Sequence, residues 1–176
     1  MLISPKLAAA INTQIGNELG AYLQYLSIAG HFHNAKLTLL EKLFFEQAAE
    51  ENAHALKFVH YLLDTKGGLN LPTIPAPKTT FANAEEAASA ALKWETEVTD
   101  QIKALMDIAV ADNDYLSQDF LQWYINEQLE EINSMETLLA IVERAGEDNL
   151  LLVEDYIAQN AIGDGGGGAE EGGAGE

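Results

Sequence analysis

Four glutamates interrupt the apolar stripes of the long helices that the hydrophobic spacing of this chain predicts. Glu18, Glu51, Glu95 and Glu131 each fall on the stripe of a different helix, at positions where leucine-like side chains are expected. Burying an ionised carboxylate is costly unless the group is paired or binds a metal ion. A fold that accommodates all four must therefore bring four helices together around one shared polar layer.

Capping and breaking residues set the helix boundaries. Ser4-Pro5 is an N-cap followed by proline at the first helical position, and Gly67-Gly68 and Gly146 are helix stops. The spacing predicts long helices over about 5–33, 36–66, 84–111 and 115–144, and a short fifth helix over about 150–160. The predicted fold class is therefore all-α.

The segment between the second and third predicted helices, residues 67–83, contains three prolines and should not be helical. Fully extended, it reaches roughly 55 Å, whereas a helix of about 30 residues is only about 45 Å long. The other connections between the long helices are short, so the helices they join should be antiparallel neighbours. The prediction is a four-helix bundle of two antiparallel pairs, joined by a crossover that runs the length of the bundle.

Each long helix has a core stripe with steps of three and four residues, and the polar interruptions fall near the middle of every stripe. In an antiparallel bundle, these mid-helix positions meet at one level. Glu97 lies two residues off the stripe of Glu95 and should face solvent. The predicted core positions are Ile11, Ile15, Glu18, Tyr22, Tyr25, Ala29, Leu40, Phe44, Gln47, Glu51, His54, Phe58, Tyr61, Ala88, Ala91, Glu95, Val98, Ile102, Leu105, Leu121, Tyr124, Gln128, Glu131, Met135, Leu138 and Val142.

A histidine and a glutamine complete the polar layer. His54 follows Glu51 at i+3, so both side chains point to one face and can bind one ion together, and Gln128 precedes Glu131 at the same spacing. Carboxylates neutralise two closely spaced divalent ions, and imidazole adds a neutral, directional ligand. Because Glu131 stands where a symmetric site would have a second histidine, the two ion positions should differ. The layer is predicted to be a dinuclear metal site inside a helix bundle.

Composition narrows the ligands and partners. The chain has no cysteine, which excludes disulfides, iron–sulfur clusters and zinc ribbons and leaves ligands that suit iron, manganese, magnesium or calcium. The net charge of −19 argues against a nucleic acid partner, which needs a basic face, and an acidic surface concentrates cations. No apolar run is long enough to span a membrane and the N-terminus does not resemble a secretory signal, so a cytoplasmic location is expected.

The chain divides into two parts. Residues 1–162 hold the predicted helices and are expected to form one domain. Residues 163–176 consist of eight glycines, two alanines and four acids. Such a segment cannot bury much apolar area, so a disordered tail is predicted there.

Three motifs resemble those of the bacterial non-haem ferritins in order and spacing: Glu50-Glu51-Asn52-Ala53-His54, Phe120-Leu121-Gln122-Trp123-Tyr124 and Glu127-Gln128-Leu129-Glu130-Glu131. The similarity covers roughly residues 1–160 and implies a ferritin-like four-helix bundle. It implies that Glu18, Glu51 and His54 bind a first iron, with Glu51 bridging, and that Glu95 and Glu131 bind a second, with Gln128 close by. It also implies a third, weaker iron position toward the inner surface, at Glu50, Glu127 and Glu130.

Further residues are candidates for roles around the site. Tyr25 matches a tyrosine thought in this family to donate an electron during oxygen reduction, and Trp123 is a second candidate donor. Three acids near the start of the fourth helix are candidates to line a channel for incoming ions: Asp112, Asp114 and Asp119. Asn52 stands where haem-binding bacterioferritins carry a methionine, so no haem is predicted.

The function that the resemblance implies is a ferroxidase and iron store. Fe(II) would bind in pairs within each bundle, oxygen or hydrogen peroxide would accept the electrons, and Fe(III) would mineralise inside a hollow shell of 24 subunits. Two alternatives stay open. One is a di-iron oxygenase or peroxidase that stores nothing, and the other is a structural bundle that binds a non-redox divalent ion.

Overall fold

The computed structural model describes residues 2–160 and 162, and within them the chain forms five α-helices, one short 3-10 turn and no strand. α1 (Pro5–Ala35) pairs with α2 (Thr38–Asp64), and α3 (Ala84–Ala111) pairs with α4 (Tyr115–Ala145). The turn η1 (Glu147–Asn149) leads into the short α5 (Leu150–Gln159). The all-α prediction and all five predicted helices are confirmed, with ends that differ by at most two residues. The predicted tail, residues 163–176, lies outside the described residues.

Side-chain caps begin three of the long helices. Ser4, Asn83 and Asp114 each accept a hydrogen bond from a backbone N–H in the first turn of α1, α3 and α4. The N-cap position of α2 is Leu37, whose side chain cannot supply such a bond. Glu154 of α5 supplies it instead, because one carboxylate oxygen accepts the N–H groups of residues 39 and 40 at 2.7 and 3.0 Å. The short fifth helix is thereby fixed to the start of α2.

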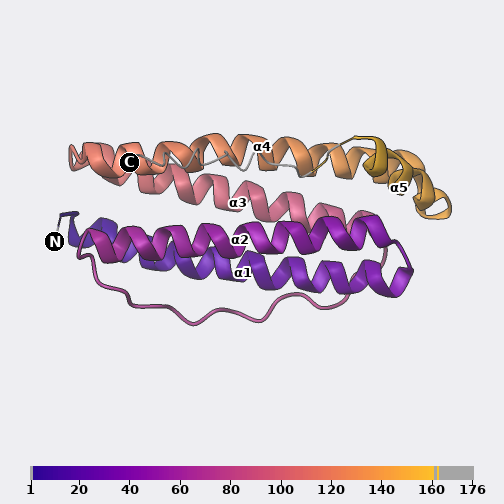
Figure 1. Cartoon of the computed structure of the whole chain (residues 1–176), viewed down its shortest axis with the longest axis horizontal. Helices are drawn as coiled ribbons and strands as arrows, with labels where there is room; N and C mark the ends of the chain where they lie inside the picture. Colours follow the sequence, from indigo (N-terminus) through magenta and orange to yellow (C-terminus); the bar gives the residue numbers. More distant parts are fainter. Residues whose placement is uncertain (1, 161, 163–176) are drawn as a thin grey trace, which may run out of the picture.

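The connection between α2 and α3 runs beside α1 along the length of the bundle (Figure 1). Near one end, Asn12 bonds to the backbone of residues 68 and 70 at 2.9 and 2.6 Å. Gly16 makes room for the ring of Pro72, which would collide with a Cβ at that position. Farther along, the Gln24 amide both donates to and accepts from the backbone of Lys78, at 3.0 and 2.9 Å. The predicted full-length crossover is confirmed, and polar α1 residues hold it in place.

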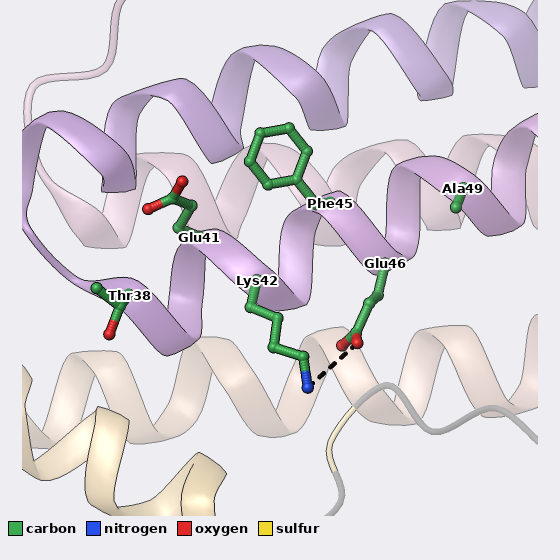
Figure 2. Close-up of a pocket in the computed structure, with 6 residues that line it drawn as sticks. All are labelled: Thr38, Glu41, Lys42, Phe45, Glu46 and Ala49. Carbon is green, nitrogen blue, oxygen red and sulfur yellow. Dashed lines mark ion pairs between the residues drawn. The ribbon is translucent and has the colours of Figure 1, made fainter.

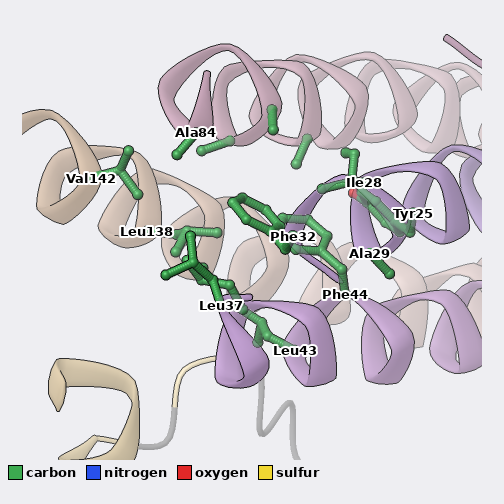
Figure 3. Packing of buried hydrophobic residues seen from close by; sticks show 14 of the residues in the cluster. Tyr25, Ile28, Ala29, Phe32, Leu37, Leu43, Phe44, Ala84, Leu138 and Val142 are labelled. Carbon is green, nitrogen blue, oxygen red and sulfur yellow. The ribbon is translucent and has the colours of Figure 1, made fainter. Parts of the chain in front are cut away.

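Two apolar clusters fill the bundle, one on each side of its middle. The first contains Phe32 and Phe44, whose rings stack with centroids 5.5 Å apart (Figure 3). The second contains Phe58 and Ile102 near the opposite end. On every long helix, a stretch without buried cluster residues separates the two clusters. These stretches lie between positions 15 and 21 of α1, 48 and 55 of α2, 91 and 98 of α3, and 124 and 135 of α4. The predicted polar layer occupies these four stretches.

The predicted core stripes are confirmed with one exception. Every predicted position is buried except Tyr22, which is only partly buried against the first cluster. Glu97 is exposed, as predicted, and lies 3.7 Å from Lys93 in an ion pair. α1 buries more than one stripe because the crossover covers a second side of it. None of the helices in the described part of the chain is both long and apolar enough to cross a membrane.

Candidate metal centre

The four stripe glutamates lie buried in the middle of the bundle, one on each long helix. Glu18, Glu51, Glu95 and Glu131 are between 0% and 3% exposed. Ligand atoms of Glu18, Glu51 and His54 all lie within 4.8 Å of one another, which is close enough for one ion to contact all three. α1 and α2 therefore bring together the residues predicted to bind the first ion.

Several buried oxygens of this layer lack a hydrogen-bond partner: Oε2 of Glu18 and both carboxylate oxygens of Glu51. Burial raises the pKa of Glu18 to about 7, and burial followed by the negative charges of Glu95 and Glu18 raises the pKa of Glu51 well above its ordinary value. Without a cation, Glu18 and Glu51 can satisfy one another only by sharing a proton. Buried polar groups are rarely left unsatisfied, and divalent ions would meet the need of both carboxylates, so the donor set fits a metal centre.

Glu95 is oriented by two donors. The Tyr25 hydroxyl donates to one of its carboxylate oxygens, and Gln128 Nε2 donates to the other at 3.0 Å. The same nitrogen faces the Glu95 carbonyl at 3.3 Å and the Thr99 hydroxyl at 3.2 Å, and this set of acceptors fixes which end of the amide is the nitrogen. Burial raises the pKa of Glu95, while the bonds from Tyr25 and Gln128 lower it. Gln128, predicted near the second ion, thus holds Glu95 in position.

His54 lies between the layer and the acids predicted to form the third position. Its Nδ1 is 3.5 Å from Glu51 Oε2, and its Nε2 is 3.9 Å from Glu127 Oε1. Burial, and then the positive charge of Lys57, lowers the pKa of His54 to about 4. The imidazole is therefore neutral at neutral pH and offers a lone pair to a metal ion.

The three acids predicted to form the third position lie beside the layer, on α2 and α4. Glu50 and Glu127 are partly buried, and Glu130 is exposed. Burial and then the charge of Glu130 raise the pKa of Glu127. The pKa of Glu131 is raised well above its ordinary value by burial, then by Glu95, Glu50 and Glu127. The acids thus form an electrostatically connected path from the buried layer toward solvent.

A family model for the ferritin-like domain matches residues 8–145 of the chain. The chain belongs to the ferritin family. It is 40% identical to ferritin BfrB of Mycolicibacterium smegmatis over 157 aligned residues. The alignment covers 89% of this ferritin and 86% of the relative. It is 32% identical over 163 residues to the bacterial non-heme ferritin of Staphylococcus haemolyticus, covering 92% and 98% of the two chains.

Solved structures show the same arrangement of helices. An open-pore ferritin from the archaeon Archaeoglobus fulgidus matches this ferritin with a TM-score of 0.86 and 28% sequence identity, over 90% of this chain and 98% of that one. The predicted resemblance to the bacterial non-haem ferritins and the ferritin-like bundle are both confirmed.

Two glutamines near the metal centre of this ferritin were not predicted as site residues. Gln14 is buried and donates to Glu18 Oε1 at 2.9 Å. Gln47 is also buried; it donates to Glu50 Oε2 at 2.7 Å, and a hydrogen bond from it lowers the pKa of Glu131. Each stands four residues before a stripe glutamate, Glu18 or Glu51. That i, i+4 spacing of a glutamine and a core carboxylate is the signal that could have identified them.

The surface of this ferritin has an open pocket of about 420 Å³ on the solvent-facing side of α2 (Figure 2). All of its lining residues belong to that helix: Thr38, Glu41, Lys42, Phe45, Glu46 and Ala49. Lys42 and Glu46 form an ion pair across it at 3.3 Å. Glu51 and His54, the buried candidate ligands on α2, do not line this pocket, so it is separate from the candidate metal centre.

Proposed function

We propose that this ferritin oxidises Fe(II) to Fe(III) at the buried carboxylate layer and stores the product inside a hollow shell made of copies of the chain. Oxygen or hydrogen peroxide is the electron acceptor. The observation that carries the proposal is the group of unpartnered carboxylate oxygens on Glu18 and Glu51 beside the neutral His54. Membership of the ferritin family supports the iron-storage role.

Fe(II) is the substrate, and we assign two ions to the layer. Glu18, Glu51 and His54 bind the first, Glu95 and Glu131 bind the second, and Glu51 lies between them. Four carboxylates offset the repulsion of two divalent ions in a low-dielectric core. Binding displaces the protons held by the carboxylates of raised pKa, so the affinity for Fe(II) rises with pH.

Tyr25 is assigned as an electron donor during reduction of the oxidant. Burial, followed by the negative charges of Glu95 and Glu51, raises the pKa of Tyr25 well above its ordinary value, so the phenol stays protonated. Its O–H points at the Glu95 carboxylate, which can accept the proton when the ring loses an electron. This is the arrangement that a tyrosine needs to leave a neutral radical rather than a buried charge.

The product leaves by the acidic path beside the layer. Glu127 lies 3.9 Å from the ligand His54, and Glu50 and Glu130 continue toward solvent. We assign these three acids to a third, weaker iron position between the buried layer and the inner surface of the shell. No haem takes part in this scheme.

Exposed apolar side chains on α2 and at the start of the crossover support assembly. Phe45, Leu56, Leu63, Leu69 and Leu71 are between 42% and 54% exposed. Several large exposed apolar side chains on one surface are typical of a protein–protein interface. We propose that other copies of the chain cover them in a closed shell of 24 subunits.

Aerobic loading with Fe(II), followed by size-exclusion chromatography and iron analysis of each fraction, tests the proposal. A large particle that holds far more iron than two ions per chain is expected. Glu51→Ala should abolish rapid oxidation, whereas Glu97→Ala, which removes an exposed acid two residues from a ligand, should not. About two ions per chain in a small oligomer would instead favour a di-iron oxygenase or peroxidase, and rapid oxidation by Glu51→Ala would overturn the site.

A further inference from the structure

A continuous series of aromatic rings connects the candidate metal centre to the end of the bundle at the α3–α4 turn. The His54 ring lies 6.0 Å from Tyr124, Tyr124 lies 5.5 Å from Phe120, and Phe120 stacks on Tyr61 at 3.8 Å with an angle of 9°. Phe58 stacks on Tyr124 at 4.1 Å and widens the contact. Each step is a ring-to-ring contact, and the Phe120 ring fills the space between Tyr61 and Tyr124, so an electron can tunnel from Tyr61 through packed rings toward His54.

Tyr61, at the far end of this series, has a route for its proton. Its hydroxyl lies 2.7 Å from Ser117 Oγ, and that Oγ lies 2.6 Å from Asp114 Oδ2. A serine hydroxyl has one proton, and Ser117 donates it to the carboxylate, so Tyr61 must be the donor to Ser117. Tyr61 and Ser117 are buried, while Asp114 is partly exposed. The relay therefore leads from a buried phenol to a carboxylate near solvent.

Two other oxidisable rings near His54, Tyr124 in the series and Trp123 beside it, lack such a route. The Tyr124 hydroxyl donates to the backbone carbonyl of His54 at 2.8 Å, and a carbonyl is too weak a base to keep a phenolic proton. Trp123 carries the Lys57 ammonium 3.2 Å from its ring centroid. The ring attracts that cation through its electrons, so the cation opposes removal of an electron. Tyr61 is the ring on which a radical can settle.

We propose that Tyr61 is a redox-active residue that supplies one electron to the metal centre when a site holds one Fe(II) instead of two. This inference rests on the proposed ferroxidase function. Tyr25 lies in the other apolar cluster and has Glu95 as its base, so the two tyrosines would serve the layer from opposite sides.

The electrons and protons balance with hydrogen peroxide as the oxidant. Cleavage of its O–O bond consumes two electrons from the protein and its iron, takes two protons from solvent, and gives two waters. Fe(II) supplies one electron and becomes Fe(III), and Tyr61 supplies the other. The Tyr61 O–H bond breaks, its proton moves to Ser117 Oγ as the serine proton moves to Asp114, and a neutral tyrosyl radical remains. The second electron prevents release of a one-electron product of peroxide inside the protein.

Freeze-quench electron paramagnetic resonance tests this role. Metal-free full-length protein is loaded anaerobically with one Fe(II) per chain, mixed with one equivalent of hydrogen peroxide and frozen, and Fe(III) is measured optically in the same samples. We expect Tyr25→Phe to retain an organic radical signal and Tyr25→Phe with Tyr61→Phe to lose it. Tyr25→Phe with Tyr115→Phe is the matched control, because Tyr115 is exposed, and it should keep the signal.

Ser117→Ala in the Tyr25→Phe background separates the relay from packing. It leaves all the rings in place and removes the proton route, so the signal should again be lost even if Tyr61→Phe were to disturb folding. Loading with two Fe(II) per chain should also reduce the signal. Formation of Fe(III) with a radical that survives both Tyr61→Phe and Ser117→Ala, or with no radical at all, would overturn the role of Tyr61 alone. Failure of the wild-type protein to form Fe(III) would overturn the ferroxidase function.

Discussion

The middle of the bundle and its two ends are buried to the same degree but have opposite chemistry. Phe32 at one end and Phe58 at the other are fully buried in apolar clusters, and such burial contributes on the order of 25 cal/mol per Å² of apolar surface. Glu51 and Glu95, in the middle, are buried just as completely, yet removing a charge from water costs several kcal/mol per ion. The apolar ends therefore stabilise the fold, and this stability offsets the cost of burying carboxylates that can bind cations in the middle.

The arrangement of the two clusters explains how the costly layer stays in place. On each long helix, apolar residues pack both before and after the polar position. A helix that is held on both sides cannot turn its glutamate toward solvent without breaking a cluster. The position of the layer is thus a consequence of the apolar packing around it. The cost of burying its carboxylates is offset only by bound ions or shared protons.

Substitution at an end of the bundle should have the largest effect on stability. Phe32→Ala removes a ring that stacks on Phe44, and a loss of about 3–5 kcal/mol in the free energy of unfolding is expected. Glu51→Gln keeps a similar volume and replaces a carboxyl that must hold a proton when buried with an amide that is always neutral, so the metal-free protein should lose no stability. Denaturant unfolding of both variants, at one protein concentration, measures this. Equal losses would show that the layer stabilises the fold as the clusters do.

Removal of a supporting donor in the middle should weaken iron binding without unfolding the chain. Gln128→Leu deletes the amide that orients Glu95, and the affinity for the second Fe(II) should fall about 10- to 100-fold. Gln122→Leu, at an exposed position of the same helix, is the control. Anaerobic calorimetric titration with Fe(II) measures the two affinities. An unchanged second affinity would mean that Glu95 needs no support from Gln128.

The stability of the metal-free protein should fall as the pH rises above about 6.5. The folded-state pKa of Glu18 is about 7 against an ordinary value of 4.5, so the folded chain holds a proton that the unfolded chain has released. This contribution is fully present below pH 4.5 and is lost as the pH rises through 7. His54, with its lowered pKa, acts in the opposite direction, but only below about 6.5.

The expected decline is on the order of 1 kcal/mol per pH unit. Above pH 7 it continues through Glu51, because the folded-state pKa of Glu51 is raised well above its ordinary value. Thermal unfolding between pH 4.5 and 8.5 measures it. The difference in stability between Glu18→Gln and the unsubstituted protein should grow between pH 4.5 and 7 and stay constant above pH 7. Saturating divalent metal should remove the decline, because the ions take over the role of the protons. A metal-free protein whose stability rises above pH 6.5 would contradict the assignment of the layer as buried and unpartnered.

Loosening the crossover should have the smallest effect, and only on stability. Gln24→Ala removes both hydrogen bonds to the backbone of Lys78, and a loss of about 1 kcal/mol is expected. The rate of iron oxidation should stay the same, since the crossover contacts α1 on a side away from the layer. Thermal unfolding and an aerobic oxidation assay on one preparation test both statements. A change in oxidation rate would show that the crossover positions the site.

The sequence predicts the fold well because each helix follows one period and each polar interruption falls on its core line. Glu95 and Glu97 illustrate this, since a shift of two residues separates a buried candidate ligand from an exposed acid in an ion pair. Tyr22 was predicted incorrectly because the fully buried position on that turn of α1 is Ala21, one residue earlier. A single stripe also cannot describe α1 as a whole, because this helix is covered from two directions.

The candidate ligand residues follow from the sequence, but the contacts among them do not. A stripe shows that Gln128 and Gln47 are buried, yet it does not show which atom of each amide faces which carboxylate. Glu154 caps α2 from more than 110 positions away along the chain, and no local pattern indicates that pairing. Such contacts depend on the final packing of the helices, which local spacing does not encode.

Crystals of the metal-free protein soaked anaerobically in Fe(II), measured by anomalous scattering at the iron edge, would locate the ions directly. Two peaks per chain are expected in the middle of the bundle. One should lie among Glu18, Glu51 and His54, and the other between Glu95 and Glu131. Peaks confined to exposed acids, with none in the buried layer, would contradict the view that this layer exists to bind and oxidise iron.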